Sequence, residues 1–281
     1  MTAASTNERS GRSPLDRLLL PGRAAVMGIL NLTPDSFSDG GRFVDPQIAI
    51  AHASQMIAQG ADIIDVGAES TRPYGGMQPV TADIERVRLE PVLPAVIALG
   101  KPVSIDTMKA RVLDWAIGLG VTIGNDVWGL QRDPDMARVV ADRGVPVIVM
   151  HNRDKADPAI DIVDDMLRYF ERSLAIADAA GMRREQIVID PGIGFGKTPE
   201  QSIIAVARLA ELKCFGLPIL IGLSRKRFIA SVVPSEPMQR LGGSIAGHLA
   251  AVRHGAVIVR THDVFETMQA LRVAEAIEKA Q

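Results

Sequence analysis

Short apolar runs and longer amphipathic segments alternate along almost the whole chain. Short apolar runs predict buried strands, whereas apolar residues spaced three or four positions apart over about ten residues or more predict helices. The predicted strands are 25–30, 62–66, 102–105, 121–124, 145–150, 187–189, 218–221 and 256–259. The predicted helices are 46–59, 82–98, 108–119, 135–143, 160–180, 199–212, 242–254 and 264–279. Several helices stop at a glycine, as helix C-termini commonly do: Gly60, Gly100, Gly120, Gly144, Gly181 and Gly255.

The regular alternation of strand and helix predicts parallel strands joined by right-handed crossovers. The strands are apolar nearly throughout, which fits a sheet that is covered by helices on one side and packed on itself on the other. Strand–helix units that repeat without a change in composition predict an α/β fold of the (β/α)8 TIM-barrel type, and 281 residues is a normal length for one such barrel. We therefore expect a flexible N-terminal tail over residues 1–20 and a single barrel domain over residues 21–281.

The composition narrows the class of protein. The chain is 47% hydrophobic and 23% charged, so it can bury a large core. Its net charge of −2 argues against a broad surface for nucleic acid or an anionic membrane. No apolar stretch approaches the roughly 20 residues of a spanning helix, and the start of the chain lacks the order of a secretory signal. We expect a cytoplasmic protein with neither nucleic acid nor a membrane as partner. The one cysteine, Cys214, excludes an intrachain disulfide and a thiolate metal cluster.

Polar residues follow every predicted strand. They are Asn31, Glu69–Arg72, Asp106, Asn125–Asp126, His151–Asn152, Asp190, Ser224–Arg227 and Arg260–His262. Any one of them alone is explained by helix capping or by a satisfied buried polar group. A barrel, however, brings the carboxyl ends of all its strands to one mouth, where its chemistry is located. This mixture of carboxylates, amides and cations suits a ligand with a hydrogen-bonding heterocycle and an anionic tail.

Several apparent motifs fail on inspection. The run "GFGKT" ends like a phosphate-binding loop, but the required first glycine falls on Pro191. A dinucleotide fingerprint that starts at Gly192 lacks its last glycine, because that position is Lys197. The histidines show no zinc-binding spacing. Asp65 lies inside the second predicted strand, where we expect a structural role in a buried polar network.

Eight motifs resemble those of bacterial dihydropteroate synthases. They are "GILNLTPDSFSDGG", "GADIIDVGAESTRP", "VSIDT", "GNDV", "VMH", "IDPGIGFGKT", "GLSRKRF" and "VRTHDV", and they occur in the order of that family. The resemblance implies a (β/α)8 barrel, a homodimer and a magnesium-dependent transferase. That enzyme joins para-aminobenzoate to 6-hydroxymethyl-7,8-dihydropterin pyrophosphate in folate biosynthesis and releases pyrophosphate. Sulfonamides are then possible inhibitors.

The same resemblance implies a role for individual residues. The implied pterin-binding residues are Asp106, Asn125, Val127, Met150, Asp190, Lys226 and Arg260. The implied pyrophosphate-binding residues are Asn31, Thr71, Arg72, Arg260 and His262, and Asn31 also lies next to Mg2+. The implied aminobenzoate-binding residues are Phe37, Ser38, Thr71, Pro73, Phe195 and Arg227. The implied catalytic residues are Asp35, Arg72, Lys226, Arg260 and His262. The stretch 31–41 is interpreted as a mobile lid, because a strand–helix loop of this length that carries a proline and an aromatic residue is typical of function.

Two departures and two alternatives accompany this interpretation. Arg227 stands where many relatives have serine, and His151-Asn152-Arg153 lacks the glycine that commonly follows Met-His. A pterin-binding methyltransferase that acts on methyltetrahydrofolate shares the barrel and the pterin site. A methyltransferase of this kind has no pyrophosphate to bind. The segments "ESTRP", "SRK" and "RTH", which would bind pyrophosphate, therefore favour the synthase. A non-catalytic pterin-binding protein would keep the pocket without the lid residues, which are present here.

Overall fold

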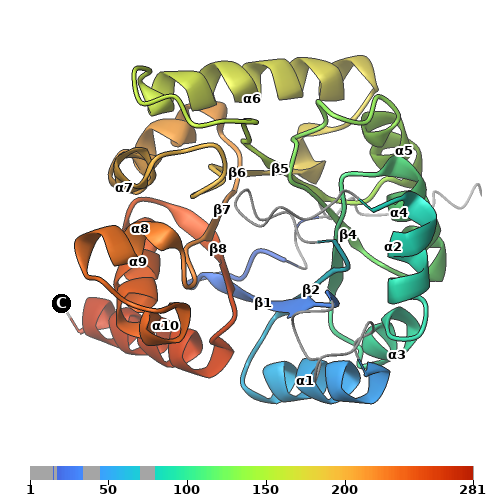
Figure 1. The fold of residues 1–281 in the computed structure, drawn as a ribbon, viewed down its shortest axis with the longest axis horizontal. Coiled ribbons are helices and arrows are strands. Elements are labelled where there is room, and N and C mark those ends of the chain that lie inside the picture. Colours follow the sequence, from blue (N-terminus) through green and yellow to red (C-terminus); the bar gives the residue numbers. More distant parts are fainter. Residues whose placement is uncertain (1–14, 16–17, 34–44, 70–79, 281) are drawn as a thin grey trace, which may run out of the picture.

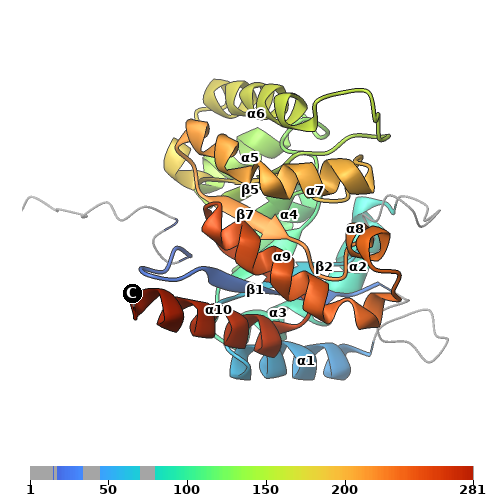
Figure 2. The same ribbon diagram turned by 90° about the vertical axis from the view of Figure 1, so that its left-hand side faces the viewer.

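A computed structural model describes residues 15, 18–33, 45–69 and 80–280. Eight parallel strands close into a barrel in chain order, and β1 pairs with both β2 and β8. Helices surround this barrel (Figures 1 and 2). The predicted (β/α)8 fold is therefore confirmed.

The strands are β1 (Ala25–Asn31), β2 (Ile63–Gly67), β3 (Val103–Asp106), β4 (Ile123–Asp126), β5 (Val147–Met150), β6 (Ile187–Asp190), β7 (Ile219–Gly222) and β8 (Ala256–Thr261). The helices are α1 (Pro46–Ala58), α2 (Ala82–Leu89), α3 (Leu93–Ala98), α4 (Ala110–Leu119), α5 (Met136–Arg143), α6 (Ile162–Ala179), α7 (Pro199–Ala207), α8 (Arg227–Val232), α9 (Leu241–Arg253) and α10 (Val264–Lys279). Short 3-10 helices cover η2 (Arg184–Gln186), η3 (Leu209–Phe215) and η4 (Pro237–Gln239).

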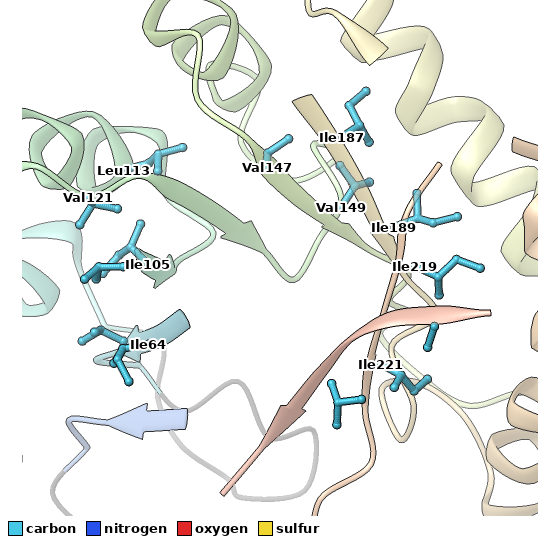
Figure 3. Close-up of a cluster of buried hydrophobic side chains, with 14 of the residues drawn as sticks. Ile64, Ile105, Leu113, Val121, Val147, Val149, Ile187, Ile189, Ile219 and Ile221 are labelled. Atoms are coloured by element: carbon cyan, nitrogen blue, oxygen red, sulfur yellow. The ribbon is translucent and has the colours of Figure 1, made fainter. Parts of the chain in front are cut away.

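The strands contribute side chains to two apolar cores, one outside the barrel and one inside it. Alternate side chains of each strand point outward and pack against the helices, as Ile187 and Ile189 of β6 do (Figure 3). The side chains between them point into the barrel and form a second cluster. Its strand members are Ala25, Met27, Ile63, Ile123, Ile148, Val188, Leu220 and Ile258. The barrel interior is thus a packed core and not a pore.

The N-terminal segment differs from the expectation of a tail that ends at residue 20. Leu15 and Leu18 are 3% and 4% exposed, and they join the cluster inside the barrel. The apolar Leu18-Leu19-Leu20 run fills the end of the barrel from which the strands start, so the packed part of the chain begins before residue 21. None of the helices in the described residues is both long and apolar enough to cross a membrane.

The helix predictions fail in three places. The segment predicted as one helix over 82–98 is broken into α2 and α3, because Pro91 has no N–H donor with which to continue the hydrogen bonds of α2. The helix predicted over 199–212 ends at Ala207 and continues as η3. Helix α8 was missed, because its six residues are too few to show a periodicity.

Candidate active site

The polar mouth of the barrel follows from the alternation of side chains along each strand. A residue two positions after an interior side chain also points inward. Asp190 follows the interior Val188 in this way, and Arg260 follows Ile258. The same relation places Asp65, Asn125 and Met150 over the apolar layer, and Asp106 over the buried Ser104. The apolar interior is therefore covered by an inward-facing polar layer at the carboxyl ends of the strands.

Arg260 joins three strands at the centre of this layer. Its Nε donates to Asp65 Oδ2 at 2.6 Å, and its Nη2 donates to Asp106 Oδ2 at 2.9 Å. The amide of Asn125 donates to both oxygens of Asp65 at 3.2 and 3.3 Å. Asp65 is fully buried, which confirms the buried polar network expected for it. It holds both the guanidinium and the amide in place and contributes no exposed oxygen of its own.

Asp106 keeps one oxygen available for a ligand. Its Oδ1 is buried and has no hydrogen-bond partner among the described residues. Burial raises the pKa of Asp106 to about 7, although the Arg260 guanidinium opposes the increase and Asp65 adds to it. An unpartnered buried acceptor is costly, so a hydrogen-bond donor on a ligand would stabilise the ionised form.

Asp190 and Met150 face the same interior from neighbouring strands, where they are aligned in the parallel register. Asp190 Oδ1 accepts from Gly192 N at 2.8 Å, which fixes the carboxylate at the start of the loop after β6. Burial raises the pKa of Asp190, and the hydrogen bond from Gly192 opposes the increase. Val127 is buried, and its carbonyl accepts from Asn152 Nδ2 at 2.9 Å, so the atypical segment after β5 supports a predicted pterin contact.

Cationic side chains and His262 come from the ends of β7 and β8. Lys226 Nζ lies 4.2 Å from the centroid of the Phe195 ring, in position for a cation–π interaction. Lys226 follows Arg225, a non-glycine residue with φ of 59°, whose N–H donates to Ser244 Oγ and whose guanidinium pairs with Asp263. These contacts hold a strained turn at the functional end of the barrel.

His262 is oriented by Ser224. The Ser224 hydroxyl lies 2.9 Å from His262 Nδ1 and accepts from the His262 N–H at 3.2 Å. Burial lowers the pKa of His262 to about 3, and the charge of Arg260 adds to the effect. The imidazole is therefore neutral near pH 7. When Ser224 donates its hydroxyl proton to Nδ1, the ring proton lies on Nε2, where it can be donated to an anion.

Some predicted site residues lie outside the described residues. They are Asp35, Phe37, Ser38, Thr71, Arg72 and Pro73. Asn31 ends β1 beside Gly67 and is half-buried, whereas Arg227 is exposed and begins α8. The described residues contain no group of three or more His, Cys, Asp and Glu that could hold a metal ion.

Two charged clusters next to the mouth were not predicted from the sequence. Lys109, at the N-terminus of α4, pairs with Glu69 and lies 2.7 Å from the buried Glu85. Lys197, which occupies the position of the last glycine in the failed dinucleotide fingerprint, is 1% exposed and contacts His151. No periodic pattern marks these residues, because they lie in loops or on different elements. The available signals were the polar runs after β2 and β5, which contain Glu69 and His151.

The fold and this polar layer place the chain in a known class. The chain belongs to the pterin-binding enzyme family, whose model, described as "Pterin binding enzyme", matches residues 27–262. Its relatives include dihydropteroate synthases of several bacteria. The one from Clostridium beijerinckii is 44% identical over 257 residues, which cover 91% of this chain and 94% of that protein.

Solved structures agree with this assignment. The dihydropteroate synthase of Clostridium difficile, determined in the presence of pteroic acid, has a TM-score of 0.87 and 49% identity over 91% of this chain and 97% of that chain. The Yersinia pestis dihydropteroate synthase, in complex with a sulfonamide drug, has a TM-score of 0.86 and 38% identity over 94% of this chain and 97% of that chain. The family predicted from the motifs is confirmed.

Proposed function

We propose that this chain is a dihydropteroate synthase. It condenses 6-hydroxymethyl-7,8-dihydropterin pyrophosphate with para-aminobenzoate to give 7,8-dihydropteroate and pyrophosphate. The observation that carries the proposal is the inward layer of Asp106, Asn125 and Asp190 beside Arg260, Lys226 and His262. The carboxylates accept from the N–H donors of the pterin edge, and Lys226 donates to the pterin carbonyl. Pteroic acid, found with the Clostridium difficile enzyme, contains both halves of the product.

The same residues support a dissociative substitution. Arg260 and the Nε2 proton of His262 stabilise negative charge on the departing pyrophosphate. The dihydropterin ring carries the positive charge that develops as the C–O bond breaks, and Asp106 and Asp190 favour that charge electrostatically. The aryl amine attacks with a lone pair that is free at neutral pH, so the site needs no strong general base to start the reaction. The nitrogen becomes positively charged as the C–N bond forms, and it then loses one proton to water or to the released pyrophosphate.

The donor chemistry of Asn31 fits magnesium. Its amide oxygen is a hard ligand at the strand end next to the proposed anion site, and Mg2+ commonly uses one or two protein ligands together with phosphate oxygens and water. Bound magnesium would neutralise charge on the pyrophosphate. Thr71, Arg72 and Asp35 keep their proposed roles at the anion, and Phe37, Ser38 and Pro73 keep theirs at the aminobenzoate.

A homodimer through the outer faces of the late helices is also part of the proposal. Two glycines of α9 are not available for this contact. A side chain at Gly243 would meet Ile229 at 2.4 Å, and one at Gly247 would meet Leu223 at 3.0 Å, so both glycines pack within the chain. The apolar surface on this flank comes from Val232, which is 66% exposed, and from other exposed side chains: Ile203 and Ile204 of α7, Val233 directly after α8, and Met238 of η4. Helices α7, α8 and α9 lie on the same flank of the barrel (Figure 2).

The decisive experiment is a pyrophosphate-release assay. Release should require both the pterin pyrophosphate and para-aminobenzoate, and sulfonamides should compete with the aminobenzoate. Methyl transfer from methyltetrahydrofolate to a corrinoid acceptor, without pyrophosphate release, would establish the methyltransferase alternative. Light scattering at micromolar concentration tests the dimer, and Val232→Asp should shift it toward monomer. A cytoplasmic location is tested by cell fractionation.

A further inference from the structure

The loop between β6 and α7 packs directly on the segment that follows β5. A Cβ atom at Gly192 would lie 2.0 Å from the His151 carbonyl oxygen, and one at Gly196 would lie 2.4 Å from Arg153 Cβ. Both glycines have positive φ, of 62° and 54°. Only glycine fits a backbone so close to its neighbour in this conformation. The backbone of the loop between β6 and α7 therefore packs directly against residues 151–153.

Lys197 folds back into the centre of this loop. Its Nζ donates to the carbonyl oxygens of Gly192 at 2.9 Å and Phe195 at 3.2 Å, and it lies 2.7 Å from His151 Nδ1. An ammonium group has three N–H donors, which matches these three acceptors. A buried lysine is otherwise unfavourable, and burial lowers the pKa of Lys197 to about 7 despite the opposing charges of Asp190 and Asp165. Such a residue is explained by a positioning role.

When Lys197 is protonated, its contact with His151 requires one particular tautomer of the imidazole. To accept at Nδ1, the neutral imidazole must carry its proton on Nε2, which faces Asp165 Oδ2 at 3.1 Å. Burial lowers the pKa of His151 to about 3, so the ring is neutral near pH 7. Asp165, which also pairs with Arg153 at 2.8 Å, thereby sets the ring for Lys197. A hydrogen-bonded chain thus runs from α6 through His151 to the loop.

The other end of this series of hydrogen bonds reaches the mouth of the barrel. The carbonyl held by Lys197 belongs to Phe195, whose ring lies 4.2 Å from Lys226 Nζ. We propose that Lys197 is a positioning residue for aminobenzoate recognition: it fixes Phe195 against Lys226 and so shapes that side of the site. This inference rests on the proposed synthase function. Asp190 depends less on Lys197, because its backbone belongs to β6 and is held by the pairing with β5.

The test compares Lys197→Met with Lys101→Met, which makes the same substitution at an exposed lysine before β3. Pterin affinity is measured by calorimetry, and KM for aminobenzoate is measured by pyrophosphate release. We expect Lys197→Met to raise the aminobenzoate KM about tenfold or more and to change pterin affinity by less than about threefold. Lys101→Met should leave both unchanged. An equal loss in both measurements, or no change in KM, would overturn the proposal.

A double-mutant cycle separates positioning from general destabilisation. If Lys197 acts through Phe195, then adding Lys197→Met to Phe195→Ala should raise the aminobenzoate KM little further. Full additivity of the two effects would contradict the inference. Asp165→Asn offers a milder change at the far end of the chain, with the exposed Asp164→Asn as its control. It should raise the aminobenzoate KM about threefold. If Lys197→Met does not fold, the Asp165→Asn result decides, and an unchanged KM there overturns the proposal.

The outcome for the unaltered protein distinguishes the two proposals. Pyrophosphate release by the wild type, with no selective effect in the variants, rejects the role of Lys197 and leaves the synthase function in place. Absence of release with both substrates rejects the synthase function and the inference that depends on it.

Discussion

The pH dependence of pterin binding tests the central carboxylate directly. In the proposed site the free Oδ1 of Asp106 accepts a pterin N–H. Because Oδ2 already accepts from Arg260, protonation would fall on Oδ1 and turn that acceptor into a donor. Burial raises the pKa of Asp106 to about 7. A carboxyl group with this pKa is roughly one-tenth ionised at pH 6, half ionised at pH 7 and nine-tenths ionised at pH 8. Affinity should therefore increase about tenfold between pH 6 and pH 8. Asp190, whose pKa is also raised by burial, can only make this increase steeper.

The assay is calorimetric titration of a pterin ligand at pH 6, 7 and 8. Asp106→Asn serves as the control, because its amide does not titrate while the ligand and the rest of the site do. The variant should bind more weakly at pH 8 and lose most of the pH dependence of the wild type. Asp126, with a pKa raised by burial to about 6, is an improbable source of the effect because its oxygens accept from Trp128 N and Leu130 N. Equal slopes for the two proteins would refute the assignment.

Three further predictions concern the site and its support. Asp190→Asn turns one acceptor toward the pterin into a donor, so pterin affinity should fall about tenfold to a hundredfold in calorimetry. Gly192→Ala should destabilise the protein by about 2 kcal/mol or more in denaturant unfolding, and by more than Gly216→Ala, which has similar φ but open space around its Cβ. His248 is buried with its pKa lowered to about 4, so the folded state binds fewer protons and stability falls as pH decreases from 6.5 to 4. That loss is about 2 kcal/mol at pH 5 and should be absent in His248→Leu thermal melts; identical pH profiles would contradict it.

The site could be predicted where it depends on strand periodicity. Asp106, Asn125 and Asp190 each end an apolar strand, and alternation alone brings them to one mouth. Lys197 could not be placed in this way. Its partner His151 is 46 positions earlier in the sequence. The contact also depends on Gly192 and Gly196, which let one loop pack closely on another, and no local sequence pattern shows which loops meet.

Local rules failed where neighbouring signals conflicted. The helical periodicity over 82–98 concealed the break at Pro91, and the polar residues before Leu15 concealed the burial of Leu15 and Leu18. In the first case the missing N–H of proline overrides a helical pattern. In the second, only the closed barrel provides the apolar surface that the leucines cover.

The leucine-filled base of the barrel also bears on the order of events in one catalytic cycle. Apolar side chains occupy the interior from the strand starts up to the polar layer. A molecule that binds against Asp190 must therefore arrive and depart through the mouth. Whatever binds later and nearer to the opening obstructs the exit of what lies below. The component that binds last should therefore be the first to leave, so the closed base of the barrel, as well as affinity, sets the order of binding.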